Sequence, residues 1–165
     1  MIVLVRIIVL GFLALPYSLI FGQVSLPDVE LRNLENKKVT LTEVVKSNQL
    51  TILSFWATWC SPCKKELDAI ADVYTEWQEE YNVELIAISV DNARAMARVK
   101  PMVVEKGWPY QIFIDPNQNL MRALNFQTVP HTILLDRNGK IVYSHSGYLP
   151  GDEIELEQEM QVLSK

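Results

Sequence analysis

Apolar and polar positions follow one another along the chain in a pattern that predicts alternating strands and helices. Residues 51–57 and 83–90 are short apolar runs rich in branched and aromatic side chains, which is typical of buried strands. Between them, apolar residues recur at helical spacing from Pro62 to Tyr81. A strand–helix–strand crossover of this length predicts parallel pairing of its two strands. The pattern therefore indicates an α/β domain.

The flanking segments are shorter and are separated by turns. A helix over residues 94–106 should break near Lys100, because Pro101 cannot lie in an uninterrupted helix interior, and Gly107 should end it. The other expected elements are a hairpin of residues 29–31 and 39–41, a short helix capped by Thr42, a strand at 112–114, a short helix at 119–125, a hairpin of 131–135 and 140–144, and a last helix from Asp152.

The first 22 residues differ from the rest of the chain in being almost entirely apolar, with Arg6 as their one charge. They resemble a secretory signal peptide cleaved near Gly22. An uncleaved membrane anchor is the alternative, because the apolar stretch nearly reaches the length of a bilayer span. We therefore expect residues 23–165 to form the folded domain, in the periplasm or secreted, with membrane contact only through the N-terminal segment.

Length, charge and cysteine content narrow the possible functions. The 165 residues suffice for one domain with its own core. The formal net charge is −5 and no basic cluster is present, so we expect no nucleic-acid partner. The chain has two cysteines, Cys60 and Cys63, and they are too close in sequence to be a framework of structural disulfides. The pair is therefore redox-active or binds a metal.

The segment Cys60-Ser61-Pro62-Cys63 stands where the first apolar strand passes into the long helix. Two cysteines at this spacing fit the first turn of a helix, where their sulfurs can form a disulfide. Unpaired N–H groups and the positive end of the helix dipole favour a thiolate there. Pro62 suits a helix start, since the N–H it lacks would have no partner. We expect Cys60 to be the exposed, attacking thiol and Cys63 the more buried, resolving thiol.

The stretch FWATWCSPCKKEL at residues 55–67 resembles the active-site motif of the thioredoxin superfamily, and its last four residues resemble the exported TlpA/ResA-like branch. The resemblance covers the chain from about Ser25 onward. It implies a thioredoxin-like α/β fold: a central mixed β-sheet flanked by helices, with an N-terminal hairpin and an inserted helix–strand element. It also implies a thiol–disulfide oxidoreductase with no cofactor beyond the Cys60–Cys63 pair.

Members of this branch usually work as reductases, for example during cytochrome c maturation. The resemblance thus implies protein disulfides as substrates and a membrane electron donor as the second partner. Val129-Pro130 resembles the family's cis-proline, a loop that faces the disulfide and leaves the backbone of Val129 free to pair with an extended substrate. We assign Trp59 and Pro62 to the same substrate-binding rim, and Trp56 to the core.

One position departs from the thioredoxin pattern. Thioredoxins carry a buried Asp immediately before the Phe-Trp-Ala stretch, and this chain has Ser54 there. Glu66 matches the active-site Glu of the branch and lies one helical turn beyond Cys63. It is therefore our candidate for the base that takes the proton of the resolving thiol. The alternative is a solvated carboxylate on the helix surface.

Two other functions use the same residues. A copper-delivery module would bind the metal through Cys60, Cys63 and His131, which follows Pro130 directly. A peroxiredoxin-like antioxidant enzyme is the second, although the segment before Cys60 lacks the Pro and Thr usually placed before such a cysteine. Copper titration and peroxide turnover separate these two functions from disulfide exchange. We expect no resident metal.

Overall fold

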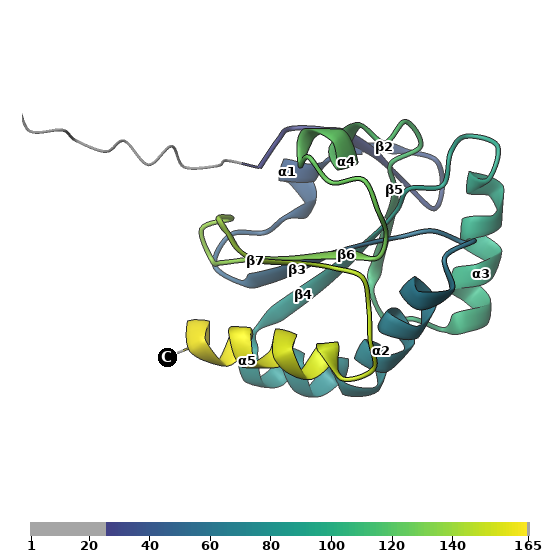
Figure 1. Ribbon diagram of the computed structural model, residues 1–165. Helices are drawn as coiled ribbons and strands as arrows, with labels where there is room; N and C mark the ends of the chain where they lie inside the picture. The colour runs from purple at the N-terminus through teal and green to yellow at the C-terminus, as the bar shows by residue number, and fades with distance from the viewer. Residues whose placement is uncertain (1–25, 165) are drawn as a thin grey trace, which may run out of the picture.

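The computed structural model describes residues 26–164, so the predicted leader at residues 1–22 lies outside the described part (Figure 1). The strands are β1 Glu30–Asn33, β2 Lys38–Thr40, β3 Leu50–Trp56, β4 Val83–Ser89, β5 Gln111–Ile114, β6 His131–Leu135 and β7 Ile141–Ser146. The helices are α1 Leu41–Val44, α2 Ser61–Tyr81, the 3-10 helix η1 Met96–Arg98, α3 Val99–Lys106, α4 Asn119–Ala123 and α5 Asp152–Ser164.

The strands form one mixed sheet in the order β2-β1-β5-β4-β3-β6-β7. Strand β3 pairs with β4 in parallel and with β6 in antiparallel register. Because it has a neighbour on both sides and helices above and below, all seven of its residues are buried. The predicted fold class is confirmed: a thioredoxin-like α/β domain with an N-terminal hairpin, β1–β2, and a helix–strand element, α3–β5, between β4 and β6.

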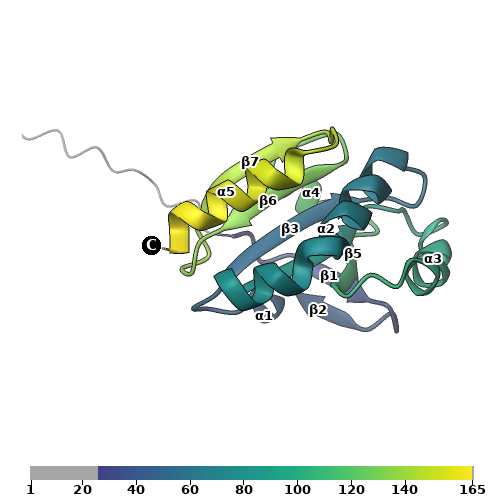
Figure 2. The same cartoon turned by 90° about the horizontal axis from the view of Figure 1, so that it is seen from below.

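Helices α2 and α5 lie side by side on one face of the sheet, and α1 and α4 lie on the other (Figures 1 and 2). The buried side chains of α2 recur at helical spacing and include Leu67, Ile70, Tyr74 and Trp77. Burying each large apolar side chain contributes about 1.5–3 kcal/mol, which fixes the helix against β3 and β4. The N-terminus of α2 thereby comes to the edge of the sheet where β3 ends.

Most predicted boundaries differ from the observed ones by one or two residues, and two of these differences have a clear local cause. The short helix begins at Leu41, with Thr40 rather than Thr42 as its N-cap, and the backbone N–H of Thr40 donates to Glu43 at 2.8 Å. The break expected near Lys100 falls between η1 and α3, so Pro101 lies in the first turn of α3, where no backbone N–H is needed. Gly107 ends α3 with a φ of 65°, as predicted.

Helices of the described part are too short or too polar to cross a bilayer: within residues 26–164, none combines the necessary length and apolar character.

Candidate active site

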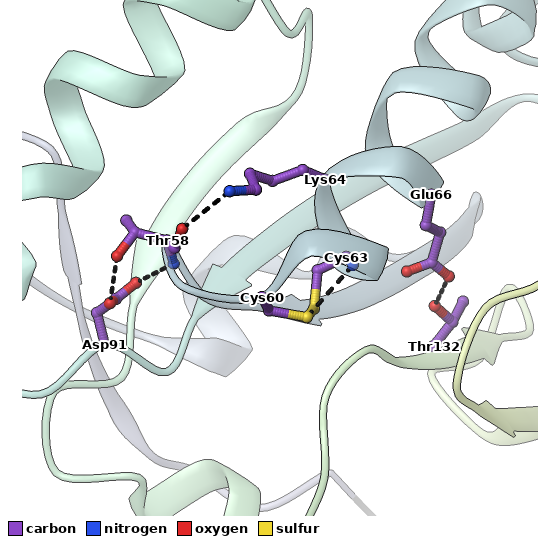
Figure 3. Close-up of a disulfide and its surroundings, with 7 residues drawn as sticks. All are labelled: Thr58, Cys60, Cys63, Lys64, Glu66, Asp91 and Thr132. Atoms are coloured by element: carbon purple, nitrogen blue, oxygen red, sulfur yellow. Dashed lines mark hydrogen bonds between the residues drawn. A yellow bond between two sulfur atoms is a disulfide. The ribbon is translucent and has the colours of Figure 1, made fainter.

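Cys60 and Cys63 form a disulfide at the N-terminus of α2, with their Cα atoms 5.4 Å apart (Figure 3). Cys60 is the N-cap residue, and the backbone N–H of Cys63 donates to its sulfur at 3.3 Å. Cys63 is fully buried, as expected. Cys60 is more accessible but only 4% exposed, so the prediction of an exposed thiol is wrong for this oxidised state. Cys60 packs into the apolar core and is bonded to Cys63, which accounts for its burial.

Thr58 is fixed from three directions just before the cysteines. Its backbone N–H and its hydroxyl donate to the carboxylate of Asp91 at 2.8 and 2.7 Å. Its carbonyl oxygen accepts a hydrogen bond from Lys64 Nζ at 3.2 Å, and all three contacts are visible in Figure 3. Asp91 is fully buried and also accepts from the Ser89 hydroxyl. The loop that carries Cys60 is therefore held to the end of β4 and to the first turn of α2.

Glu66 lies beneath the helix surface, with 5% of its area exposed, so the alternative of a solvated carboxylate is wrong. The Thr132 hydroxyl donates to its Oε1 at 2.5 Å (Figure 3). Burial raises the pKa of Glu66 to about 7, the Thr132 bond opposes this rise, and the charges of Asp152 and Glu153 add to it. A carboxyl group with this pKa exchanges its proton near neutral pH.

The carboxyl group of this site comes from α2 and not from the strand below it. Ser54, at the position of the thioredoxin Asp, is fully buried, and its hydroxyl has no hydrogen-bond partner among the described residues. It stands opposite Thr132 in the β3–β6 register. Glu66 therefore reaches Thr132, on the strand next to Ser54, from the helix above.

The Val129–Pro130 bond is cis, as the resemblance implied. Val129 and Trp59 line one groove of about 270 Å³, together with Val90, Gln118, Met121, Gln127 and Thr128. Trp59 is 68% exposed, whereas Trp56 is fully buried and packs edge-on against Trp108 at 5.0 Å between ring centroids. Pro62 is exposed on the first turn of α2 but does not line the groove. The groove thus begins next to Cys60.

His131 is placed differently from what a copper site needs. Its Nδ1 lies 2.7 Å from the Ser146 hydroxyl and its Nε2 lies 3.2 Å from the Ser144 hydroxyl, both on β7. Its ring stacks on Phe126 at 4.0 Å, and burial lowers its pKa. Across residues 26–164, no cluster of three or more His, Cys, Asp or Glu side chains is arranged to hold a metal ion. This arrangement gives no support to the copper hypothesis.

Asp91 and Thr132 are site residues that the sequence did not reveal. Asp91 had a recognisable signal, because the ends of the adjacent parallel strands β3 and β4 meet at one edge of the sheet, and Asp91 follows β4 closely. Thr132 had none, since it is one of several apolar or β-branched residues in a strand 66 positions after Glu66.

Comparisons with known proteins agree with this geometry. Residues 23–144 match the model of the AhpC/TSA family. The thiol-disulfide oxidoreductase ResA of Bacillus anthracis is 30% identical over 129 residues, which are 78% of this chain and 72% of that protein. ResA of Halalkalibacterium halodurans is 32% identical over 77% of this chain and 64% of its own length.

Comparison with solved structures identifies proteins of the same fold. A thioredoxin-like protein from Porphyromonas gingivalis is 42% identical and superposes with a TM-score of 0.76, over 84% of this chain and 91% of that one. StoA from Bacillus subtilis, at 23% identity, shares the fold with a TM-score of 0.64 over 81% of this chain and 97% of its own.

Proposed function

Because the chain belongs to the AhpC/TSA family and is one of its thioredoxin-like thiol–disulfide oxidoreductases, we propose that it reduces disulfide bonds of exported proteins. The observation that carries the proposal is the Cys60–Cys63 disulfide at a helix N-terminus, with the buried carboxyl group of Glu66 one turn further along the helix. A helix N-terminus favours a thiolate, and a carboxyl group with a pKa of about 7 can take up a thiol proton at neutral pH.

The reaction begins from the dithiol. The Cys60 thiolate attacks one sulfur of the substrate disulfide, and the other substrate sulfur leaves as a thiolate. Cys63 then gives its proton to Glu66 and attacks the Cys60 sulfur of the mixed disulfide. The second substrate sulfur leaves, so the substrate gains two electrons and the Cys60–Cys63 disulfide forms. The N–H of Cys63, which points at the Cys60 sulfur, stabilises negative charge on that atom.

The substrate occupies the groove beside Cys60. Trp59 provides a large exposed aromatic surface, and Val129 lines the same groove. An extended peptide would pair with the backbone of Val129 ahead of Pro130, and Pro62 would contact it from the first turn of α2. The groove combines apolar side chains with the amide and hydroxyl groups of Gln118, Gln127 and Thr128, so both the side chains and the backbone of a protein substrate would find partners there.

Export and regeneration complete the proposal. Residues 1–22 direct the chain to the periplasm or the outside, as a cleaved signal or as an anchor. Disulfides persist in such compartments, so a reductase needs electrons from elsewhere. A membrane electron donor returns the Cys60–Cys63 pair to the dithiol, and cytochrome c maturation is one process that would use it.

The reduction potential of the Cys60–Cys63 pair, measured in glutathione or dithiothreitol buffers, tests the reductase direction. We expect a value closer to that of thioredoxin, about −270 mV, than to that of the oxidant DsbA, about −120 mV. A value near the latter would make the protein an oxidase. Peroxide turnover and copper titration, run on the same reduced protein, test the peroxiredoxin and copper alternatives, and we expect neither activity.

A further inference from the structure

Glu66 lines a small cavity bounded by four elements. The cavity has a volume of about 10 Å³ and lies between α2, β6, β7 and α5. Its polar lining comes from Glu66, Thr132, His145, Asp152 and Glu153, and the rest of its wall is mainly apolar. A space of about 10–15 Å³ by this measure holds one water molecule if polar partners surround it. The cavity has both the size and the partners for a single water.

The strand register sets His145 next to Thr132. In the β6–β7 pairing Thr132 stands opposite His145, and directly opposed side chains of antiparallel strands lie on the same face of the sheet. On this face Glu66 reaches Thr132 from α2. His145 Nε2 in turn lies 3.2 Å from Asp152 on α5, and these two side chains are 33% and 24% exposed. A line of polar groups thus leads from the buried carboxyl group to solvent.

The two oxygens of Glu66 have different surroundings. Oε1 accepts the hydrogen bond from Thr132, and Oε2 has no donor among the described residues although it is fully enclosed. In the view of Figure 3 the oxygen that Thr132 does not contact lies on the side of the disulfide. With 5% of the residue exposed, a proton accepted from Cys63 has no direct way into bulk water. The carboxyl group needs an intermediary to release that proton.

We propose that the cavity binds one water molecule that carries the proton between Glu66 and His145, and that the His145–Asp152 pair exchanges this proton with solvent. The inference rests on the proposed function. Cys63 gives its proton to Glu66, and Glu66 passes a proton to the water. The water passes one to His145, and the resulting imidazolium is held by Asp152 until it loses the proton to solvent. No electron moves in these steps, and the carboxylate is restored for the next cycle.

The other ionisable groups around Glu66 do not offer this route. Glu153 of α5 shares the cavity, and its carboxylate is engaged by the Tyr148 hydroxyl at 3.0 Å. Tyr143 of β7 and Tyr148 keep their protons at neutral pH, because burial raises the pKa of each to about 12. Burial also raises the pKa of Tyr110, which precedes β5. Among these types of side chain, histidine is the one that ordinarily exchanges protons near neutral pH.

A multiple-turnover experiment with chemical rescue tests the route, because the relay restores the Glu66 carboxylate between cycles. Insulin is reduced by the protein with dithiothreitol in excess, and the steady-state rate is measured at several pH values. We expect His145→Ala to be slower by about tenfold at pH 7, less than the roughly 10²–10⁴-fold contributed by a group that takes the proton directly. Added imidazole should restore the rate, because it replaces the missing proton carrier. His145→Gln keeps the shape of the side chain and should be slow as well.

The matched control is Glu155→Gln, which removes another carboxylate from the first turn of α5 outside the cavity and should leave the rate unchanged. A wild-type rate in both His145 variants overturns the inference, and so does a slow rate that imidazole does not restore; the proposed function survives either result. If the wild-type protein reduces no insulin at any pH, both the proposed function and this proton route are wrong.

Discussion

Thr132 donates a hydrogen bond of 2.5 Å to Glu66 across 66 positions of sequence. The bond joins β6 to α2 beside the disulfide and holds one oxygen of a carboxyl group that is otherwise enclosed by the protein. Burial outweighs the bond, so the pKa of Glu66 rises to about 7. The proposed reaction depends on this relationship, because it gives Cys63 a nearby proton acceptor that works near neutral pH.

The raised pKa makes the stability of the fold depend on pH. Folded protein binds the Glu66 proton more tightly than unfolded protein does, so the contribution to stability is full below pH 4.5 and is lost as the pH rises through about 7, above which both states have released the proton. Glu66→Gln removes this loss and should be more stable than wild type at pH 8 by up to about 3 kcal/mol, since a tenfold change in acidity corresponds to about 1.4 kcal/mol. Urea unfolding of both proteins at pH 5 and pH 8 measures the difference in their free energies of unfolding. A difference of the same size at both pH values would contradict the raised pKa of Glu66.

The same substitution should change the chemistry of the thiols. A carboxylate opposes a second negative charge nearby, so Glu66→Gln should lower the pKa of Cys60 or Cys63. It should also slow resolution of the mixed disulfide by about 10²-fold, because the proton acceptor is lost. Alkylation of the reduced protein against pH measures the first effect. Glu76→Gln, on the exposed face of α2, is the control, and alkylation curves of Glu66→Gln that superimpose on wild type would end the assignment.

Asp91 should contribute to both stability and activity by fixing the loop before Cys60. Asp91→Asn replaces a carboxylate oxygen with an NH₂ group that cannot accept from Thr58 or Ser89. We expect a loss of about 1.5–3 kcal/mol in the free energy of unfolding, the range for hydrogen bonds to a charged group. Urea unfolding measures it, with Asp72→Asn on the exposed side of α2 as control. A loss below about 0.5 kcal/mol, as for an ordinary surface change, would contradict the role.

Trp59 should matter for substrate binding and not for folding. Its side chain is 68% exposed and lines the groove, so Trp59→Ala should raise KM for insulin several-fold and leave the free energy of unfolding nearly unchanged. Val104→Ala removes a comparably exposed apolar side chain on α3, away from the groove, and should leave KM unaltered. Steady-state kinetics of both variants decide the question: an equal KM in both would place substrate elsewhere.

The sequence determined most of the fold because its strongest signals are local. Apolar runs and helical spacing located β3, α2 and β4, and the parallel pairing of the two strands follows from the crossover between them. The cap of α1 was misplaced because Thr40 and Thr42 are equally good capping residues and only the position of Glu43 distinguishes them. Local chemistry thus left an ambiguity of two residues.

The candidate site was only partly readable for a different reason. Cysteine spacing located the disulfide, but the near-complete burial of Cys60 depends on how the core packs around it. The partners of Thr58 and Glu66 lie 33 and 66 positions away along the chain. Single-sequence patterns carry no information about such distant pairs, so the hydrogen bonds that fix the site had to come from the structure.

Trapping of mixed disulfides tests the central claim, that Cys60 attacks and Cys63 resolves. Reduced Cys63→Ser and Cys60→Ser proteins are incubated with a disulfide-bonded protein substrate, and covalent complexes are separated without reductant. We predict that Cys63→Ser accumulates a mixed disulfide through Cys60, because nothing remains to resolve it. Cys60→Ser should accumulate none, since Cys63 is fully buried. Complexes formed by Cys60→Ser and absent from Cys63→Ser would contradict the account.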